Sequence, residues 1–515
     1  MSYPQFHFFV RSSCAAIVTC VIVVGTLLAQ PRIAAPVKKS RVLSNARQAA
    51  VQSGLQTIEN NQIRVGINTN YGGAITYLAF KDTRNGNVRT ENIVNNYDLG
   101  RQVQIGIYSG PEDYSRRGAE AWVGLGWNPI QAGDVYGNPA KVLTVEKQQN
   151  LLYVKSIPTQ FAINNEPGEV TIEHWIRLEN NVVKVHAKIV MFRSDKRQFT
   201  ARQQEFPCIY ANGEYHNIWY YRRGKPYSND DLDLARPPMD YGEVLPTEPW
   251  MASVNDKGYG VGLYVPGVYE WKKGYFGTEY AGDEFSAESA YIGATNSVLL
   301  DHNMTYEWDY ELVLGHITEI RSHVYSKPHP LTGPNYRFDT SRKGWFYYNA
   351  QDTGWPISGK LHVKLDNARE NQIKSPYAFW KGRDNPKLYV RAAFNTQNNQ
   401  FRLGWRRAED KTLYGTGDRL VNFPIINDGQ FHTYEIDLSR NENWLNYNIG
   451  QLVFRPIEDG PPINGWAEFE WISTQKDGPV AEAVDPEDPI EVACEPGCSP
   501  VTAQRIRYIP GNRKQ

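Results

Sequence analysis

The sequence predicts an all-β protein, built from a large two-sheet sandwich that is followed by a smaller jelly-roll β-sandwich. Apolar and polar residues alternate with a period of two along most of the chain, as they do in half-buried strands. No segment of ten or more residues stands out with helical periodicity. The 515 residues include 42 Gly and 31 Pro for turns, and 14 Trp, 32 Tyr and 19 Phe for large cores or wet binding surfaces.

The first body of the chain, residues 58–325, contains the clearest strand pair. From Val170 to Leu178 the residues alternate between an apolar and a polar face, and a turn at Glu179–Asn181 leads to a second alternating run, Val183–Met191. This pattern is typical of an antiparallel hairpin with one face in a core. About 270 residues exceed one small sandwich, so we expect two large sheets packed face to face. Further strand candidates, in chain order, are Ile63–Ile67, Ala74–Phe80, Val142–Val145, Val261–Val265 and Tyr306–Leu314.

A linker rich in Pro, residues 326–335, separates this body from a second β-rich body at residues 336–474. About seven strands in about 140 residues are typical of a jelly-roll sandwich. Residues 475–515 form a Pro- and acid-rich tail, which we expect to be disordered. The strand candidates of the second body are Lys360–Leu365, Lys387–Asn395, Phe401–Arg407, Phe431–Leu438, Gln451–Arg455 and Ala467–Ile472.

Residues 1–31 are predicted to form a signal peptide or a signal anchor, followed by a polar, basic stalk at residues 32–57. The uncharged stretch from Ser12 to Pro31 suits the hydrophobic region of an export signal and approaches the length of a membrane span. We therefore expect an exported protein that is periplasmic, extracellular, or held by a single N-terminal membrane anchor and facing outward. The formal net charge of −1 provides no basic field for nucleic acid.

Glu173 lies on the polar face of its predicted strand, together with Trp175 and Arg177. An aromatic ring stacks on the apolar face of a pyranose and charged groups bind its hydroxyls, so this grouping suits a sugar site. The alternative is an ordinary ion pair between Glu173 and Arg177. His174 points with the apolar row and is expected in the core.

The segment 202–216 is dense in reactive side chains. Glu205 suits a general acid or base, and Tyr210, Tyr215 and His216 suit contacts with a substrate. A Pro and a Gly in this segment are typical of loops carried on a rigid sheet, where sites usually lie. The alternative is a polar surface loop.

Two more groups have the chemistry of a sugar site. Asn96 and Arg101 follow the predicted strand Ala74–Phe80, and amides and guanidinium groups are natural partners of sugar hydroxyls and carboxylates. Trp122 and Trp127 lie close together among polar residues, which favours a carbohydrate subsite. Packing in a large sandwich core is the alternative for both tryptophans.

No cofactor and no metal site are predicted. The segment Asn229–Asp233 holds three acids and could bind Ca²⁺, but it lacks the spacing of an EF-hand, so a solvated acidic loop is the favoured interpretation. The sequence contains no H-E-x-x-H, G-x-S-x-G or P-loop motif. These absences argue against a zincin metalloprotease, an α/β-hydrolase and a nucleotide-dependent enzyme.

The run Tyr71–Lys81 (YGGAITYLAFK) and the segment Asn92–Gln104 (NIVNNYDLGRQVQ) resemble the opening of galactose mutarotase-like domains. The segment Gly258–Pro266 (GYGVGLYVP) fits the same pattern. The resemblance covers about residues 58–325 and implies a β-supersandwich, a fold shared by sugar epimerases, many glycoside hydrolases and several polysaccharide lyases. The paired catalytic histidines of the mutarotases are not clearly matched, since Arg101 stands where one of them is expected.

The second body is similar to the galactose-binding-like β-sandwich that accompanies many carbohydrate-active enzymes. The segments Gln451–Pro456 (QLVFRP) and Ala467–Ile472 (AEFEWI) look like the last two strands of that fold. This resemblance implies a jelly-roll domain at residues 336–474.

Three functions fit these residues. The first is an exported glycoside hydrolase that acts on a polysaccharide or oligosaccharide through Glu205 and Glu173 as paired carboxylates. The second is a polysaccharide lyase on the same fold, in which Tyr215 or His216 removes a proton next to a uronate carboxyl and the amide and guanidinium named above neutralise it. The third is a non-catalytic glycan-binding or envelope protein. A carbohydrate is the expected partner in each case, and the sequence does not define the oligomeric state.

Overall fold

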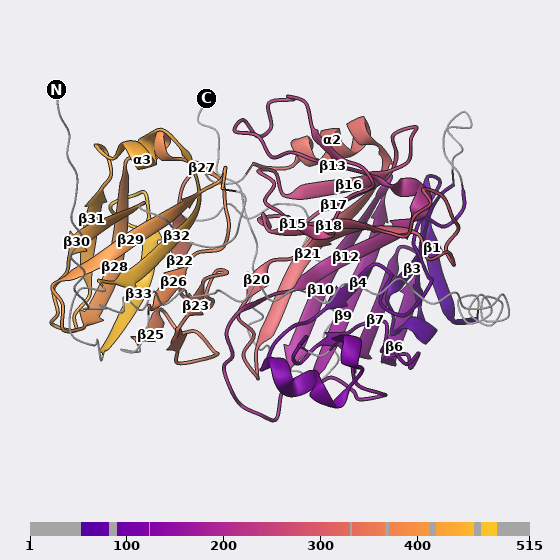
Figure 1. Ribbon diagram of the computed structural model, residues 1–515, viewed down its shortest axis with the longest axis horizontal. Coiled ribbons are helices and arrows are strands. Elements are labelled where there is room, and N and C mark those ends of the chain that lie inside the picture. Colours follow the sequence, from indigo (N-terminus) through magenta and orange to yellow (C-terminus); the bar gives the residue numbers. More distant parts are fainter. Residues whose placement is uncertain are drawn as a thin grey trace, which may run out of the picture. The chain divides into compact units, whose positions relative to one another are not determined.

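The computed structural model describes residues 53–81, 90–122, 124–329, 332–365, 370–410, 419–457 and 465–480. In these ranges the predicted all-β class is confirmed, with a larger and a smaller sandwich (Figure 1). The predicted export segment and most of the predicted stalk and tail lie outside the described residues. Within the described ranges, no helix is long and apolar enough to cross a bilayer.

A nine-stranded antiparallel sheet forms one layer of the first sandwich. The predicted hairpin lies within it: β9 and β10 pair along their lengths, and the long strand β21 pairs with the other edge of β10 (Figure 1). The apolar residues from Val170 to Leu178 face the core, as their alternation predicts. In sheet order the strands are β14 (Asp233–Ala235), β13 (Asn217–Tyr220), β16 (Trp250–Val254), β17 (Tyr259–Tyr264), β21 (Thr305–His316), β10 (Val182–Met191), β9 (Val170–Glu179), β7 (Leu151–Ile157) and β6 (Lys141–Gln148).

A seven-stranded antiparallel sheet forms the opposite layer. Its strand β12 pairs with β19 on one side and with β4 on the other. In sheet order the strands are β15 (Gly242–Val244), β18 (Trp271–Phe276), β19 (Ser289–Ala294), β12 (Glu205–Asn212), β4 (Gln104–Gly106), β5 (Pro129–Ile130) and β8 (Thr159–Gln160). Two smaller sheets contain β1 (Leu55–Glu59), β2 (Ile63–Asn68) and β3 (Ile75–Phe80), and β11 (Arg202–Gln203) and β20 (Ser297–Val298).

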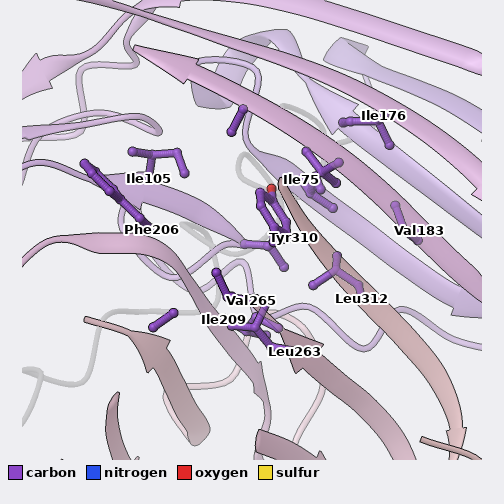
Figure 2. Packing of buried hydrophobic residues seen from close by; sticks show 14 of the residues in the cluster. Ile75, Ile105, Ile176, Val183, Phe206, Ile209, Leu263, Val265, Tyr310 and Leu312 are labelled. Atoms are coloured by element: carbon purple, nitrogen blue, oxygen red, sulfur yellow. The ribbon is translucent and has the colours of Figure 1, made fainter. Parts of the chain in front are cut away.

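The two large sheets pack face to face around one apolar core. Phe206 and Ile209 of β12 belong to the same cluster as Tyr310 and Leu312 of β21 (Figure 2). The ring of Phe206 stacks on Trp308, with ring centroids 4.4 Å apart. Full burial of one such side chain stabilises the fold by about 1.5–3 kcal/mol. The apolar face of each sheet points into this core. The alternate residues along each strand therefore point to the outer face of their sheet.

The structure contains a ten-residue helix that the sequence pattern did not predict, α2 (Ile317–Ser326). Only Ile320 and Val324 are buried in it, and they pack in a small cluster with Trp250 and Val313. Two buried positions in ten residues give too weak a periodicity to be recognised in the sequence. The other helical turns are α3 (Glu442–Leu445), η1 (Thr69–Tyr71), η3 (Glu112–Arg117), η4 (Glu120–Trp122), η5 (Gly213–Tyr215) and η6 (Gly382–Asp384).

The second sandwich, drawn in orange to yellow in Figure 1, consists of two antiparallel sheets between which the chain passes repeatedly, as in a jelly roll. Its core contains Trp345, Trp405 and Trp444, so these rings are structural. One sheet contains β24 (Ala350–Asp352), β25 (Leu361–Leu365), β33 (Gly465–Ser473), β28 (Lys387–Asn395), β31 (His432–Asp437) and β22 (Asn335–Arg337). The other contains β23 (Phe346–Tyr348), β26 (Gln372–Lys374), β32 (Asn448–Pro456), β29 (Gln400–Arg407), β30 (Leu420–Pro424) and β27 (Trp380–Lys381).

A buried charge cluster joins the loop before β21 to the second sandwich. The Arg342 guanidinium donates two hydrogen bonds to the Asp352 carboxylate, of 2.6 and 2.7 Å. It also lies 2.7 Å from Asp301, in an ionic contact without the angle of a hydrogen bond. Gln198 donates to both carboxylates. Burial alone would raise the pKa of Asp352, but the hydrogen bonds and charge of Arg342 lower it below its ordinary value.

We expect Arg342→Met to lower the free energy of unfolding by about 3–5 kcal/mol, because it leaves two buried carboxylates without their counter-charge. Urea denaturation followed by circular dichroism measures this loss. The control Lys387→Met removes an exposed ion pair with Glu435 and should leave the urea midpoint nearly unchanged. Equal effects of the two substitutions would contradict the prediction.

Candidate functional site

Glu205 lies on the outer face of the seven-stranded sheet, because its neighbour Phe206 points into the core. Its side chain is almost buried, with 9% of the residue exposed. The Tyr291 hydroxyl donates a 2.6 Å hydrogen bond to one carboxylate oxygen, and the Tyr108 hydroxyl donates a 3.2 Å hydrogen bond to the other. Two hydroxyl donors at the two oxygens fix the orientation of the carboxylate and match its ionised form.

Three glycines make room for this arrangement. A Cβ at Gly106 of β4 would lie 2.7 Å from a Glu205 carboxylate oxygen, and a Cβ at Gly293 of β19 would lie 2.4 Å from the Tyr291 hydroxyl. Gly274 of β18 lies beneath Tyr241 in the same way, at 3.1 Å. These three positions, which we call the glycine floor, let the carboxylate and the phenol rings lie flat against the sheet.

Aromatic rings surround the carboxylate. Tyr210 makes an edge-to-face contact with Tyr291 at 4.9 Å and stacks near Phe276 at 5.8 Å, and Tyr241 packs 5.2 Å from Tyr291. Tyr210, Tyr241 and Phe276 are only half-buried, so part of each ring is available to a ligand.

Burial, followed by the charge of Glu205, raises the pKa values of three of these phenols well above the ordinary value; they are Tyr108, Tyr210 and Tyr291. The hydroxyls therefore remain protonated at neutral pH. They act as hydrogen-bond donors to the carboxylate and are poor candidates for a general base.

Two further ionisable groups lie on this face next to Trp271, which points into the core. Glu270 is buried and accepts hydrogen bonds from the backbone N–H and the hydroxyl of Ser297, at 2.7 and 3.0 Å. Burial raises its pKa to about 7. Lys272 follows two residues later and lies opposite Glu243 of β15 in the sheet register.

The structure does not bring Glu173 to this site. Glu173 lies on the outer face of the nine-stranded sheet, where it accepts a 2.8 Å hydrogen bond from Tyr153 and lies 3.4 Å from Lys155. The apolar core separates that face from Glu205, so the predicted carboxylate pair does not form. Alternation assigned Glu173 to an outer face, but the segment around Glu205 was predicted to be a loop, whereas residues Glu205–Asn212 form strand β12 of the other sheet. Trp175 packs beside Glu173, against Tyr153, and is nearly buried.

Asn96 and Arg101 hold the loop that borders the Glu205 face. Asn96 is buried and donates to the Glu284 carboxylate at 2.9 Å. Arg101 donates to the Ala287 carbonyl and the Ser289 hydroxyl. The guanidinium carbon of Arg101 lies 5.6 Å from the centre of the Phe276 ring, so this cation lies beside the aromatic surround.

The remaining predicted contact residues are dispersed. Trp127 and Tyr215 belong to the core, each 2% exposed; core packing was the alternative for Trp127, whereas Tyr215 was expected in a loop. His216 lies beyond Asn212, at the end of β12 that is opposite to Glu205. The strand from Glu205 to Asn212 spans on the order of 23 Å, at about 3.3 Å per residue. His216 contacts Asp256 at 3.2 Å. Trp122 is half-buried and packs edge-on against Phe161. Of the two predicted lyase bases, Tyr215 is therefore turned into the core.

Sequence reasoning did not single out Tyr241, Lys272 or Tyr291 as site residues. The signal near two of them was a glycine inside a strand: Gly274 lies beneath Tyr241, and Gly293 follows Tyr291 by two residues. A glycine within a strand often marks a close approach to the sheet. Which side chain makes that approach depends on long-range pairing, which the sequence does not give.

Among the residues described by the structure, no three His, Cys, Asp or Glu side chains converge in a way that could hold a metal ion. In the acidic loop at residues 229–233, the Asp233 carboxylate accepts a 2.9 Å hydrogen bond from the backbone N–H of Arg222. The side chain of Arg223 lies 3.9 Å from the same carboxylate.

No family model and no curated protein matches the chain. Solved structures with similarity include a galactose mutarotase related enzyme from Lactobacillus acidophilus, with 11% identity over 51% of this chain and 97% of that chain, at a TM-score of 0.34. A 4-alpha-glucanotransferase from Thermococcus litoralis matches with 13% identity over 51% and 37%, at a TM-score of 0.31. A polysaccharide lyase matches with 9% identity over 77% and 46%, at the same TM-score.

The first of these solved structures comes from the mutarotase-like group, which is the group that the sequence of the first body resembles. At these TM-scores the similarity indicates neither a reaction nor a substrate.

We expect Gly293→Ala to displace the Tyr291 hydroxyl from Glu205, because the added Cβ would lie 2.4 Å from that hydroxyl and the ring is fully buried. The strain should lower the free energy of unfolding by about 1–3 kcal/mol. Urea denaturation and a crystal structure of the variant test both effects. Gly242→Ala is the control, because its added Cβ meets no atom within 4 Å. An unchanged Tyr291–Glu205 hydrogen bond in the variant would contradict the prediction.

The raised pKa of Glu270 predicts a pH-dependent stability. Between pH 4.5, its ordinary pKa, and about pH 7, the native carboxyl keeps a proton that the unfolded chain has lost. The free energy of unfolding should therefore fall as the pH rises through this window, by up to about 3 kcal/mol from this group. Glu270→Gln should remove that fall. Urea midpoints of both proteins at pH 5 and pH 8 measure it, and parallel pH dependences would rule out the assignment.

Proposed function

We propose that this protein is a carbohydrate-active enzyme whose reaction occurs on the outer face of the seven-stranded sheet, with Glu205 as the group that transfers the proton. The observation that carries the proposal is the nearly buried Glu205 carboxylate, held by the Tyr108 and Tyr291 hydroxyls above the glycine floor. Such a fixed carboxylate is suited to general acid–base chemistry.

The surround of the carboxylate supports a sugar as substrate. The half-buried rings of Tyr210, Tyr241 and Phe276 present apolar faces next to phenol hydroxyls. A pyranose has the same combination of an apolar face and a rim of hydroxyls. Rings with one apolar and one polar end bind such ligands by stacking and hydrogen bonding together.

We favour hydrolysis of a glycosidic bond, which requires a second carboxylate across the bond from the first. Glu243 and Glu270 lie on the Glu205 face and replace Glu173 as candidates. Glu270 has a pKa of about 7, which suits a general acid, because the group is still largely protonated near neutral pH. Glu243 is exposed and is the more accessible of the two.

We also propose that the enzyme acts outside the cytoplasm. The support is the uncharged apolar stretch between Ser12 and Pro31, followed by the basic stalk. Fractionation of cells that express the full chain tests this proposal, and recovery of the protein in the cytoplasm alone would contradict it.

We expect Glu205→Gln to lower turnover by about 100-fold or more on whichever polysaccharide the wild type degrades, because the amide cannot exchange a proton. A panel of neutral and acidic polysaccharides, analysed for new reducing ends and for unsaturated uronates, identifies the substrate and separates hydrolysis from elimination. Glu173→Gln makes the same change on the other sheet and should leave turnover unchanged. Unchanged turnover in Glu205→Gln would overturn the site assignment.

A further inference from the structure

Lys272 is a nearly buried cation without a partner on the Glu205 face. It is 8% exposed, and its ammonium makes no hydrogen bond or ion pair with any residue in the described part of the chain. The closest interaction in that part is with the Tyr241 ring, whose centre lies 5.9 Å from the ammonium nitrogen. Tyr241 belongs to the aromatic surround of Glu205, so the ammonium lies at the proposed site.

Several other buried or half-buried cations in the described part of the chain have carboxylate partners. Arg342 is paired with Asp301 and Asp352, and Lys327 lies 2.7 Å from Glu311. Removing a charge from water is costly unless a partner of opposite charge compensates for it. Lys272 has no such partner among the described residues, and a ligand would supply one.

Three carboxylates act on Lys272 through space, those of Glu205, Glu243 and Glu270, but none of them forms an ion pair with it. Both oxygens of Glu205 accept hydrogen bonds from tyrosine hydroxyls, and Glu270 is bound to Ser297. Burial lowers the pKa of Lys272, while the surrounding negative charges, that of Glu205 first, oppose the shift. These charges are therefore close enough to act through space, but none of them lies within ion-pair distance among the described residues.

We propose that Lys272 binds an oxyanion carried by the substrate, either the carboxylate of a uronic acid or a sulfate ester on a sugar ring. This inference rests on the proposed function, since it assigns the substrate of that site to the acidic glycans. A neutral sugar would leave the ammonium unpaired, whereas a charged oxygen within hydrogen-bond distance would satisfy it. One charge-assisted hydrogen bond of this kind corresponds to about a 10- to 100-fold gain in affinity.

The test compares acidic glycans with their neutral counterparts. Calorimetry measures the binding of polygalacturonate and its carboxyl-reduced form, and of a sulfated galactan and its desulfated form. We expect the wild type to bind one acidic member about 10- to 100-fold more tightly than its counterpart, and Lys272→Met to lose that preference. Preference in the first pair identifies a carboxylate, and preference in the second identifies a sulfate.

Two variants complete the design. Lys273→Met is the matched control, since it removes the next lysine of β18, which alternation directs to the opposite face. It should keep the preference. Lys272→Arg retains the positive charge and should keep most of the preference even where Lys272→Met folds poorly.

Three results would overturn the inference: equal binding of acidic and neutral glycans by the wild type, a preference that survives in Lys272→Met, or no binding of any acidic glycan. A different result would overturn the proposed function and leave this inference standing. That result is Lys272-dependent binding of acidic glycans without Glu205-dependent conversion of any polysaccharide. Turnover of neutral glycans alone would preserve the proposed function and refute the role of Lys272.

Discussion

The packing of the nine-stranded sheet against the seven-stranded sheet determines what each strand of the first sandwich can display. Phe206 of β12 stacks on Trp308 of β21, and this contact is repeated by aliphatic neighbours along both strands. Once Phe206 points inward, Glu205 beside it must point outward, because successive side chains of a strand alternate. The core therefore decides both the stability of the sandwich and the face on which Glu205 lies.

On the outer face of the seven-stranded sheet, the three glycines without side chains matter as much as the polar residues above them. Gly106, Gly274 and Gly293 lie on three strands of one sheet and leave space directly beneath Glu205, Tyr241 and Tyr291. Without this space the carboxylate and the phenols would stand away from the sheet and could not share hydrogen bonds. The same flat layer leaves the ammonium of Lys272 close to several negative charges but paired with none of them in the described chain. A site with one held carboxylate and one unsatisfied cation is suited to a ligand that is both hydroxylated and acidic.

The second sandwich uses its large aromatic residues differently. Trp345, Trp405 and Trp444 fill its core, and the Arg342 cluster fixes the start of the domain to Asp301 of the first body. Such a buried ionic contact is weak evidence for stability by itself, but breaking it is costly because both carboxylates are already removed from water. The aromatic richness of the chain therefore reflects two cores and one aromatic outer face, and the cores account for much of it.

The sequence by itself determined the all-β class, the β9–β10 hairpin and the outward direction of Glu173, because a period of two is a local property of the strand. It also singled out the segment 202–216 for its density of ionisable and aromatic side chains. Only the tertiary structure decided that Glu205 and Glu173 lie on different sheets, that Trp127 and Tyr215 belong to the core, and that Lys272 and Tyr291 join the site. The physical reason is that alternation fixes the face of a strand but not its neighbours, and a site is made by strands that lie far apart in the chain.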